Sequence, residues 1–158
     1  MIKIHERVFV ANDLACSKGN SGLAVVHACK TCHQRVIGYS GNLQKTHPNY
    51  LVLEQDYDLF LNIIDPPARL FMPQLFTSFL SFATKHWGGG KRLLVHCNKG
   101  ESRAPSLALL FLAKRLSVIN KTSYQSARIE FELLYPQYKP GQGIEIYFIK
   151  NWDTIGYE

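Results

Sequence analysis

The sequence has no long apolar run and no export signal, and both absences narrow the class of protein. Its longest uninterrupted apolar stretch is seven residues, Leu107 to Ala113, whereas a membrane-spanning helix needs ~20. The N-terminal segment carries Lys3, Glu6 and Arg7 and lacks the sustained apolar stretch of a secretory signal. We therefore expect a cytoplasmic protein without a membrane span.

Cysteine is scarce, and the positive charge is not concentrated. Without an export signal, the four cysteines are expected to be reduced thiols. The net charge is +6, but basic residues never run beyond two, as at Lys91-Arg92. A nucleic-acid binder usually gathers its basic residues on one face or tail. Nucleic acid is therefore a possible partner that we do not favour, and the charge suits a phosphate ion without selecting the substrate.

The composition predicts a folded globule, because 46% of the residues are hydrophobic and 19% are charged. A chain of 158 residues fits a single domain spanning residues 1–158. Short β-branched or alternating runs bounded by turn-forming residues predict strands. These runs are Arg7–Ala11, Leu23–His27, Leu51–Glu54, Leu59–Ile64 and Leu93–His96.

Helical patterns dominate the second half of the chain. Pro73 suits a first helical turn, and apolar residues follow it at helical spacing until Gly88–Gly90. The segment from Pro105 to about Leu116 is apolar nearly all round, which is typical of a buried helix. Thr122 and Gln125 predict a capping box for another helix, and we favour a helix again over 144–152. Together these elements predict an α/β domain with a central, mainly parallel sheet flanked by helices.

The segment between strand 93–96 and the long apolar helix has the residues of a phosphate-binding loop. Backbone N–H groups and the dipole at a helix N-terminus favour an anion, and Gly100 permits a tight turn. Arg103 can direct two N–H groups onto phosphate oxygens. This environment should stabilise Cys97 as a thiolate, which is a nucleophile towards a phosphate ester. The loop contains His96, Cys97, Asn98, Lys99, Gly100, Glu101, Ser102 and Arg103.

The interval between cysteine and arginine is weak support by itself, because Cys29 also precedes Arg35 by six residues. The second segment has no glycine, and no helical pattern is recognisable after it. We therefore assign the phosphate loop to Cys97 and not to Cys29.

At these residues the sequence resembles the dual-specificity branch of the protein tyrosine phosphatase superfamily, and the likeness continues through the segment after Arg103. The resemblance implies that Cys97 is the nucleophile, Arg103 the phosphate clamp and His96 a support for the loop. It also implies a general-acid aspartate some thirty residues earlier. Asp65 lies 32 residues before Cys97, and an acid there could protonate the leaving oxygen.

The implied activity is metal-independent hydrolysis of phosphomonoesters, without a cofactor, on a phosphorylated protein or peptide. The same chemistry on RNA 5′-phosphates or phosphoinositides is an alternative. Ala104 stands where most relatives have Ser or Thr, whose hydroxyl helps the thiolate leave. This departure predicts slow breakdown of the phosphocysteine, and it motivates a further alternative, a phosphate-binding pseudophosphatase.

A second group of candidate ligands surrounds Cys29. Cys29-Lys-Thr-Cys32-His33 matches a haem-attachment pattern that belongs to exported proteins, so we reject haem. A zinc site could use Cys29, Cys32 and His27 or His33, with Cys16 as a further ligand. A redox-active pair is a third interpretation. We favour ordinary packing or surface cysteines.

Overall fold

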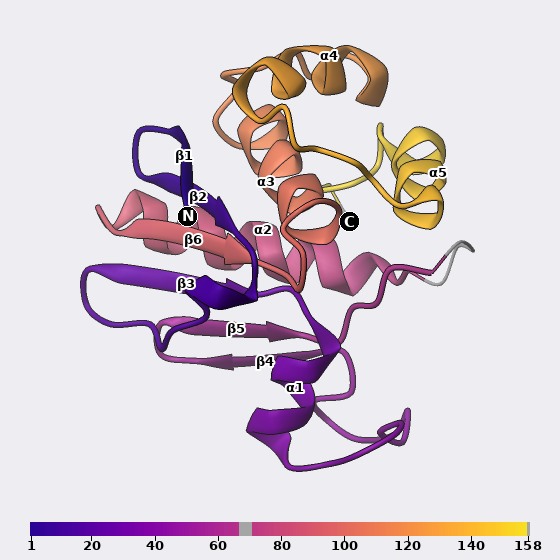
Figure 1. The fold of residues 1–158 in the computed structure, drawn as a ribbon. Coiled ribbons are helices and arrows are strands. Elements are labelled where there is room, and N and C mark those ends of the chain that lie inside the picture. The colour runs from indigo at the N-terminus through magenta and orange to yellow at the C-terminus, as the bar shows by residue number, and fades with distance from the viewer. Residues whose placement is uncertain (67–70, 158) are drawn as a thin grey trace.

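The computed structural model describes residues 1–66 and 71–157, and its strands form one six-stranded sheet (Figure 1). Their order across the sheet is β1-β2-β6-β3-β5-β4. The four central strands run parallel, and the edge strands β1 and β4 pair antiparallel. The predicted mainly parallel sheet is confirmed. The strands are β1 (Ile2–His5), β2 (Val8–Ala11), β3 (Leu23–His27), β4 (Val52–Gln55), β5 (Asp58–Leu61) and β6 (Arg92–His96).

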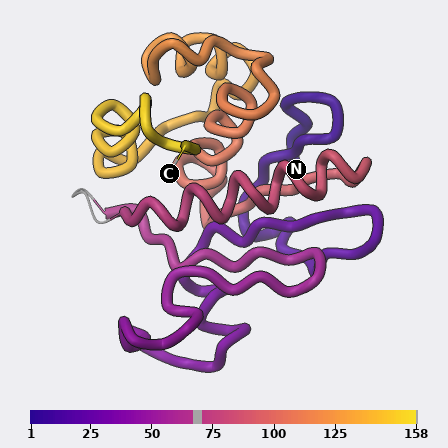
Figure 2. Tube along the Cα trace, turned by 180° about the vertical axis from the view of Figure 1, so that it is seen from behind, coloured from indigo at the N-terminus to yellow at the C-terminus, as the bar shows by residue number. Residues whose placement is uncertain are grey.

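Four of the helices gather on one face of this sheet, and α1 lies apart from them near β5 (Figures 1 and 2). None of the helices in the described residues is both long and apolar enough to cross a membrane. The helices are α1 (Lys30–Ile37), α2 (Pro73–Gly88), α3 (Arg103–Lys114), α4 (Tyr124–Leu134) and α5 (Gln142–Asn151).

The two faces of the sheet are packed differently. In β6, Leu93 and Val95 join the large core beneath α2–α5, whereas Leu94 joins a small cluster on the opposite face. The same alternation runs through β2 and β3, as expected for side chains that alternate along a strand. In α3, every residue from Ala104 to Ala113 is buried. This all-round burial explains its uniformly apolar sequence.

Most predicted elements are confirmed, with four differences. The helix after residue 122 is capped by Ser123, whose Oγ accepts the N–H of Ser126 at 3.1 Å. The predicted cap on Thr122 is wrong, because its hydroxyl instead donates to Asn120 at 2.7 Å. Strand β5 ends at Leu61, earlier than expected. Strand β1 and helix α1 were not predicted.

Candidate active site

The predicted phosphate loop occupies the carboxyl edge of the sheet, between β6 and α3. Cys97 directly follows β6 and is only 2% exposed. Gly100 has φ +72°, and a Cβ there would lie 3.0 Å from the carbonyl carbon of Ala11. Because L side chains rarely adopt positive φ, the loop requires glycine at this position on both conformational and steric grounds.

The carbonyl groups of the loop accept hydrogen bonds from residues outside the loop. Asn98 O accepts the N–H of Asp13 at 3.3 Å, and Gly100 O accepts the hydroxyl of Tyr135 at 2.7 Å. Glu101 O accepts the N–H of Lys139 at 2.8 Å. These three contacts fix the orientation of the peptide units.

The amide N–H groups of the loop differ from its carbonyl groups in their hydrogen bonding. Within the described residues, no N–H from Asn98 to Arg103 donates a hydrogen bond to protein. Consecutive backbone N–H groups at the start of a helix form an anion-binding concavity. The segment therefore has the donors that a phosphate group needs.

Arg103 begins α3 and turns back over the loop. Its Nη1 donates to Ile63 O at 3.1 Å, and its Nη2 donates to Asn98 Oδ1 at 2.8 Å. Its Nε is buried without a partner among the described residues. Since an unsatisfied buried donor is costly, this Nε is available to an oxygen of a bound anion.

Asp65 lies close to the α3 end of the loop. Its carboxyl Cγ would be 2.7 Å from a Cβ built on Gly141, so the two residues are in contact. Gly141 N–H in turn donates to Ser102 Oγ at 2.7 Å. The structure thus brings Asp65 to the loop from a segment 32 residues earlier, and the Asp65 side chain is exposed. Lys99 also points to solvent, and Glu101 is half-buried.

His96, the residue before the loop, is part of a buried chain of polar groups that the sequence analysis missed. Its Nε2 lies 2.8 Å from Nδ1 of His27, and Nε2 of His27 lies 2.8 Å from Oδ1 of Asp58. Burial lowers the pKa of His96 to about 4, so the imidazole is neutral at pH 7. Desolvation also lowers the pKa of His27, against the opposing effect of Asp58. Only the pairing of β3 with β6 reveals this contact.

Cys29 and Cys32 are both buried, so neither is the surface cysteine that the sequence allowed as an alternative to ordinary packing. Cys29 occupies the N-cap position of α1 without a side-chain capping hydrogen bond, and its Sγ lies 2.7 Å from Sγ of Cys32. The shared hydrogen bond lowers the pKa of Cys29 to about 7 and raises that of Cys32. His33, a candidate zinc ligand in the sequence, contacts the Tyr39 hydroxyl and the Asn49 carbonyl, each at 2.8 Å.

Comparison with known proteins finds similarity in sequence to one dual-specificity phosphatase and in fold to several phosphatase structures. No family model matches the chain. Human dual specificity protein phosphatase 12 is 26% identical to the chain over 106 residues. The match covers 67% of the chain but only 29% of that relative's length.

Solved structures show the same fold over nearly the whole chain. Human tyrosine phosphatase-like serine/threonine/tyrosine-interacting protein matches with a TM-score of 0.67 and 16% identity, over 99% of this chain and 97% of that one. Human DUSP28 matches with a TM-score of 0.67 and 14% identity, covering 99% of each chain. The Yvh1 phosphatase domain from Chaetomium thermophilum matches with a TM-score of 0.63 and 14% identity, over 96% of this chain and 94% of that one. The predicted fold and the resemblance to the dual-specificity branch are confirmed.

Proposed function

We propose that this protein is a cysteine-dependent phosphomonoester hydrolase that acts through a phosphocysteine on Cys97. The proposal is carried by the run of amide N–H groups from Asn98 to Arg103 and by the Arg103 Nε, none of which has a protein partner among residues 1–66 and 71–157. Donors fixed in advance towards developing charge are usually the largest contribution to such catalysis.

In the first step the Cys97 thiolate attacks phosphorus, and the bond from phosphorus to the leaving oxygen breaks. The loop N–H groups and Arg103 bind the three non-bridging oxygens as charge shifts among them. Asp65 gives its proton to the leaving alkoxide or phenoxide. The products are an alcohol or phenol and a phosphorylated Cys97.

In the second step water attacks the phosphorus of phosphocysteine, and the Asp65 carboxylate accepts the proton. The S–P bond breaks, which restores the thiolate and releases inorganic phosphate. Ala104 is fully buried in the first turn of α3 and has no hydroxyl to assist the departing sulfur. We therefore expect the second step to limit turnover.

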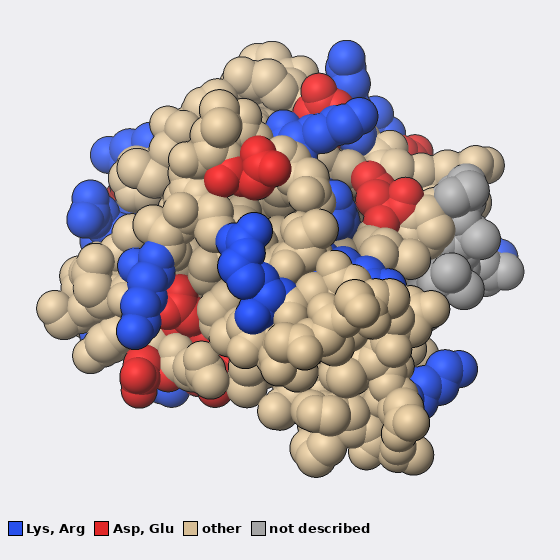
Figure 3. Space-filling model, turned by 60° about the horizontal axis from the view of Figure 1, so that its bottom comes forward, with Lys and Arg blue, Asp and Glu red and all other residues tan. Residues whose placement is uncertain are grey.

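We propose a phosphorylated protein or peptide as the substrate. A pocket of about 710 Å³ is lined by Ile63, whose carbonyl binds Arg103, and by apolar residues that include Leu51 and Phe71. Lys30 and Lys45 also line it. This pocket suits an apolar or aromatic group next to the phosphate. On the face shown in Figure 3, basic side chains are scattered among acidic ones, which gives no support for a nucleic-acid substrate there.

A second candidate function is phosphate binding without turnover, as in a pseudophosphatase. Ala104 is the observation that favours it. The presence of Cys97, Arg103 and Asp65 around one loop favours the hydrolase.

The two candidates differ in a metal-free assay with p-nitrophenyl phosphate. We expect release of nitrophenol by the wild type, none by Cys97→Ser, and a reduced rate for Asp65→Ala across mildly acidic to neutral pH. Vanadate binding, measured in parallel, checks that the loop is folded in each variant. Vanadate binding without Cys97-dependent release would identify a pseudophosphatase. A panel of phosphotyrosine peptide, phosphoserine peptide, phosphoinositide and RNA 5′-phosphate would then test the substrate.

A further inference from the structure

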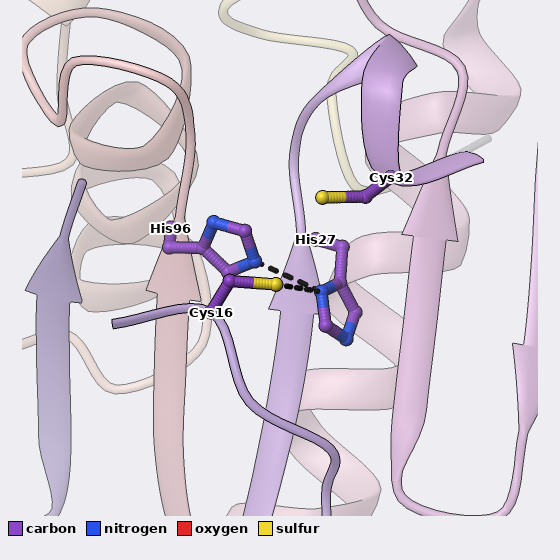
Figure 4. Close-up of side chains that lie close together, drawn as sticks. All are labelled: Cys16, His27, Cys32 and His96. Carbon is purple, nitrogen blue, oxygen red and sulfur yellow. Dashed lines mark hydrogen bonds between the residues drawn. The ribbon is translucent and has the colours of Figure 1, made fainter. Parts of the chain in front are cut away.

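Four side chains with metal-binding atoms converge behind the phosphate loop. Cys16, His27, Cys32 and His96 each offer one ligand atom, and these atoms all lie within 4.8 Å of one another (Figure 4). His27, Cys32 and His96 are buried, and Cys16 is half-buried. The residues are far apart in the sequence. They come from the segment before β3, the end of β3, the first turn of α1 and the end of β6.

The spacing of these atoms is close to that of a tetrahedral site. Zn–N bonds of ~2.0–2.1 Å and Zn–S bonds of ~2.3 Å place tetrahedral ligand atoms roughly 3.3–3.8 Å apart. Cys16 Sγ lies 3.6 Å from His27 Nδ1, and His96 Nε2 lies 2.8 Å from the same atom. Shifts of about 1 Å or less, within the reach of side-chain torsions, would place all four atoms at tetrahedral separations.

The surroundings of His27 match those of a metal-binding histidine. Its Nδ1 faces the cluster, while its Nε2 contacts Asp58 at 2.8 Å. Asp58 is itself fixed by the N–H of Gly19 at 2.8 Å. A ligating histidine almost always donates its second ring N–H to a carboxylate, carbonyl or water. Phe60 stacks on the imidazole with ring centroids 4.3 Å apart, which holds its orientation.

The cluster is also accessible and separate from the phosphate donors. A pocket of about 430 Å³ is lined by Cys16, His27, Cys32 and Asp58, so an ion could enter from solvent. His27 and His96 point to the sheet face opposite the large core, because they alternate with Val26 and Val95. Nδ1 of His96 has no partner in the described residues, so the only hydrogen bond of this ring is directed into the cluster.

We propose that Cys16, His27, Cys32 and His96 form a Zn²⁺ site of the Cys2His2 type. Binding converts the two thiols to thiolates and releases their protons to solvent. Because the four ligands fill a tetrahedral shell, the ion keeps no position for substrate and acts as a structural cross-link. It joins α1 and the Cys16 segment to the strand that carries the phosphate loop. This site differs from the sequence-based candidates, since it includes His96 and leaves out Cys29 and His33.

The test uses the full chain, reduced and freed of metal with a chelator, then titrated with Zn²⁺ against a chromophoric chelator. Co²⁺ is added in a separate titration, because tetrahedral thiolate–imidazole coordination of cobalt gives characteristic visible and charge-transfer bands. We expect one ion per chain and a thermal midpoint that rises with Zn²⁺ concentration. Asp58→Asn should weaken binding ~10–100-fold, as loss of an outer partner does.

Ligand and non-ligand cysteines provide matched variants. Cys16→Ser and Cys32→Ser should weaken Zn²⁺ binding by more than Asp58→Asn does, whereas Cys29→Ser and Cys97→Ser should leave it unchanged. Cys16 is only half-buried, so we expect Cys16→Ser to fold. Its Zn²⁺ affinity therefore tests the proposal even if another variant fails to fold. The proposal is overturned if the metal-free chain takes up no Zn²⁺ at micromolar concentration. It is equally overturned if Cys16→Ser binds as the wild type does, or if Cys97→Ser abolishes binding.

Discussion

Two segments of this chain, Cys97–Arg103 and Cys29–Arg35, have a cysteine six residues before an arginine. They follow the neighbouring parallel strands β6 and β3, whose last residues His96 and His27 are register partners. After β6 the chain forms an open loop and begins its helix only at Arg103. After β3 the helix begins already at Lys30. Equal spacing after the ends of neighbouring strands has produced two different structures.

The difference comes from the residues inside each interval. Gly100 allows a positive φ in the first segment, and outside donors such as Tyr135 hold the loop carbonyls. In the second segment the interval is helical, so its N–H groups after the first turn bond within the helix. Arg35 is exposed, whereas Arg103 bonds Ile63 and Asn98. A phosphate cradle therefore needs a loop between cysteine and arginine, and the interval alone does not provide it.

The largest difference in kcat/KM between variants of the two segments should come from substituting their arginines. Arg103→Lys removes the planar fork that can bind two phosphate oxygens, so kcat/KM on p-nitrophenyl phosphate should fall ~10²–10³-fold. Arg35→Lys should leave kcat/KM within about twofold, as expected for an exposed residue away from the site. Equal losses for the two variants would contradict the assignment of the loop.

A comparison of glycines tests the loop backbone. Gly100 and Gly38 both have positive φ, at +72° and +89°, so alanine at either position should cost about 1–2 kcal/mol in the free energy of unfolding, measured with urea. In the described chain a Cβ on Gly38 meets nothing within 4 Å, whereas one on Gly100 meets Ala11. Only Gly100→Ala should lower kcat/KM, by roughly 10–100-fold. An active Gly100→Ala enzyme would show that the loop tolerates a different backbone.

The residue after each arginine also differs, and Ala104 is the one that directly follows the phosphate loop. Ala104→Ser should accelerate breakdown of phosphocysteine by about threefold to tenfold, the value of one ordinary hydrogen bond. In stopped-flow experiments at high enzyme concentration, the initial burst of nitrophenol should shrink while the steady rate increases. An unchanged burst, with hydrolysis still limiting the rate, would show that the hydroxyl has no role here.

The smallest predicted effect is a pH dependence of stability that involves α3, the helix after the phosphate loop. Tyr138 bonds Ser106 in α3 and Tyr124 in α4, each at 3.0 Å. Burial raises the pKa of Tyr124 to about 12 and that of Tyr138 well above its usual value. Above pH 10 the unfolded tyrosines lose protons that the folded ones retain, so stability should fall by up to ~1.4 kcal/mol per pH unit per tyrosine.

Urea unfolding between pH 9 and about 11 measures this loss of stability, within the range where tyrosine ionises. Tyr124→Phe should reduce the slope, whereas Tyr157→Phe, at a residue that is 70% exposed, should leave it unchanged. The same slope in Tyr124→Phe as in the wild type would show that the buried tyrosine pair does not cause the dependence.

The sequence was informative where local patterns are strong. The limits of β3 were predicted to the residue, and the apolar segment after Arg103 is the buried helix that its composition indicates. Helix α1 was missed because only Cys32 and His33 are buried along it, so no apolar stripe marks it. Strand β1 is a short edge strand with half of its residues exposed, and its alternation is too brief to recognise.

Only part of the site was predictable, because a local pattern reveals residues that are contiguous in the sequence but not contacts between strands. The loop is contiguous, so its residue types stand together in the sequence. The chain of contacts from His96 through His27 to Asp58 depends on the strand order β6-β3-β5, which no local pattern contains. Asp58 begins β5 and is 4% exposed, and nothing in its local sequence marks it as a partner of a histidine. The roles of Cys97, Arg103 and Asp65 stay predictions.

The most direct test of the central claim is the mass of the protein trapped during turnover. Enzyme mixed with p-nitrophenyl phosphate is quenched in acid within milliseconds and measured intact, for the wild type, Cys97→Ser and Cys29→Ser. We predict one added phosphoryl group in the wild type and in Cys29→Ser, mapped to Cys97 by peptide analysis, and none in Cys97→Ser. A phosphoryl group that persists in Cys97→Ser, or that maps to Cys29, would contradict the account.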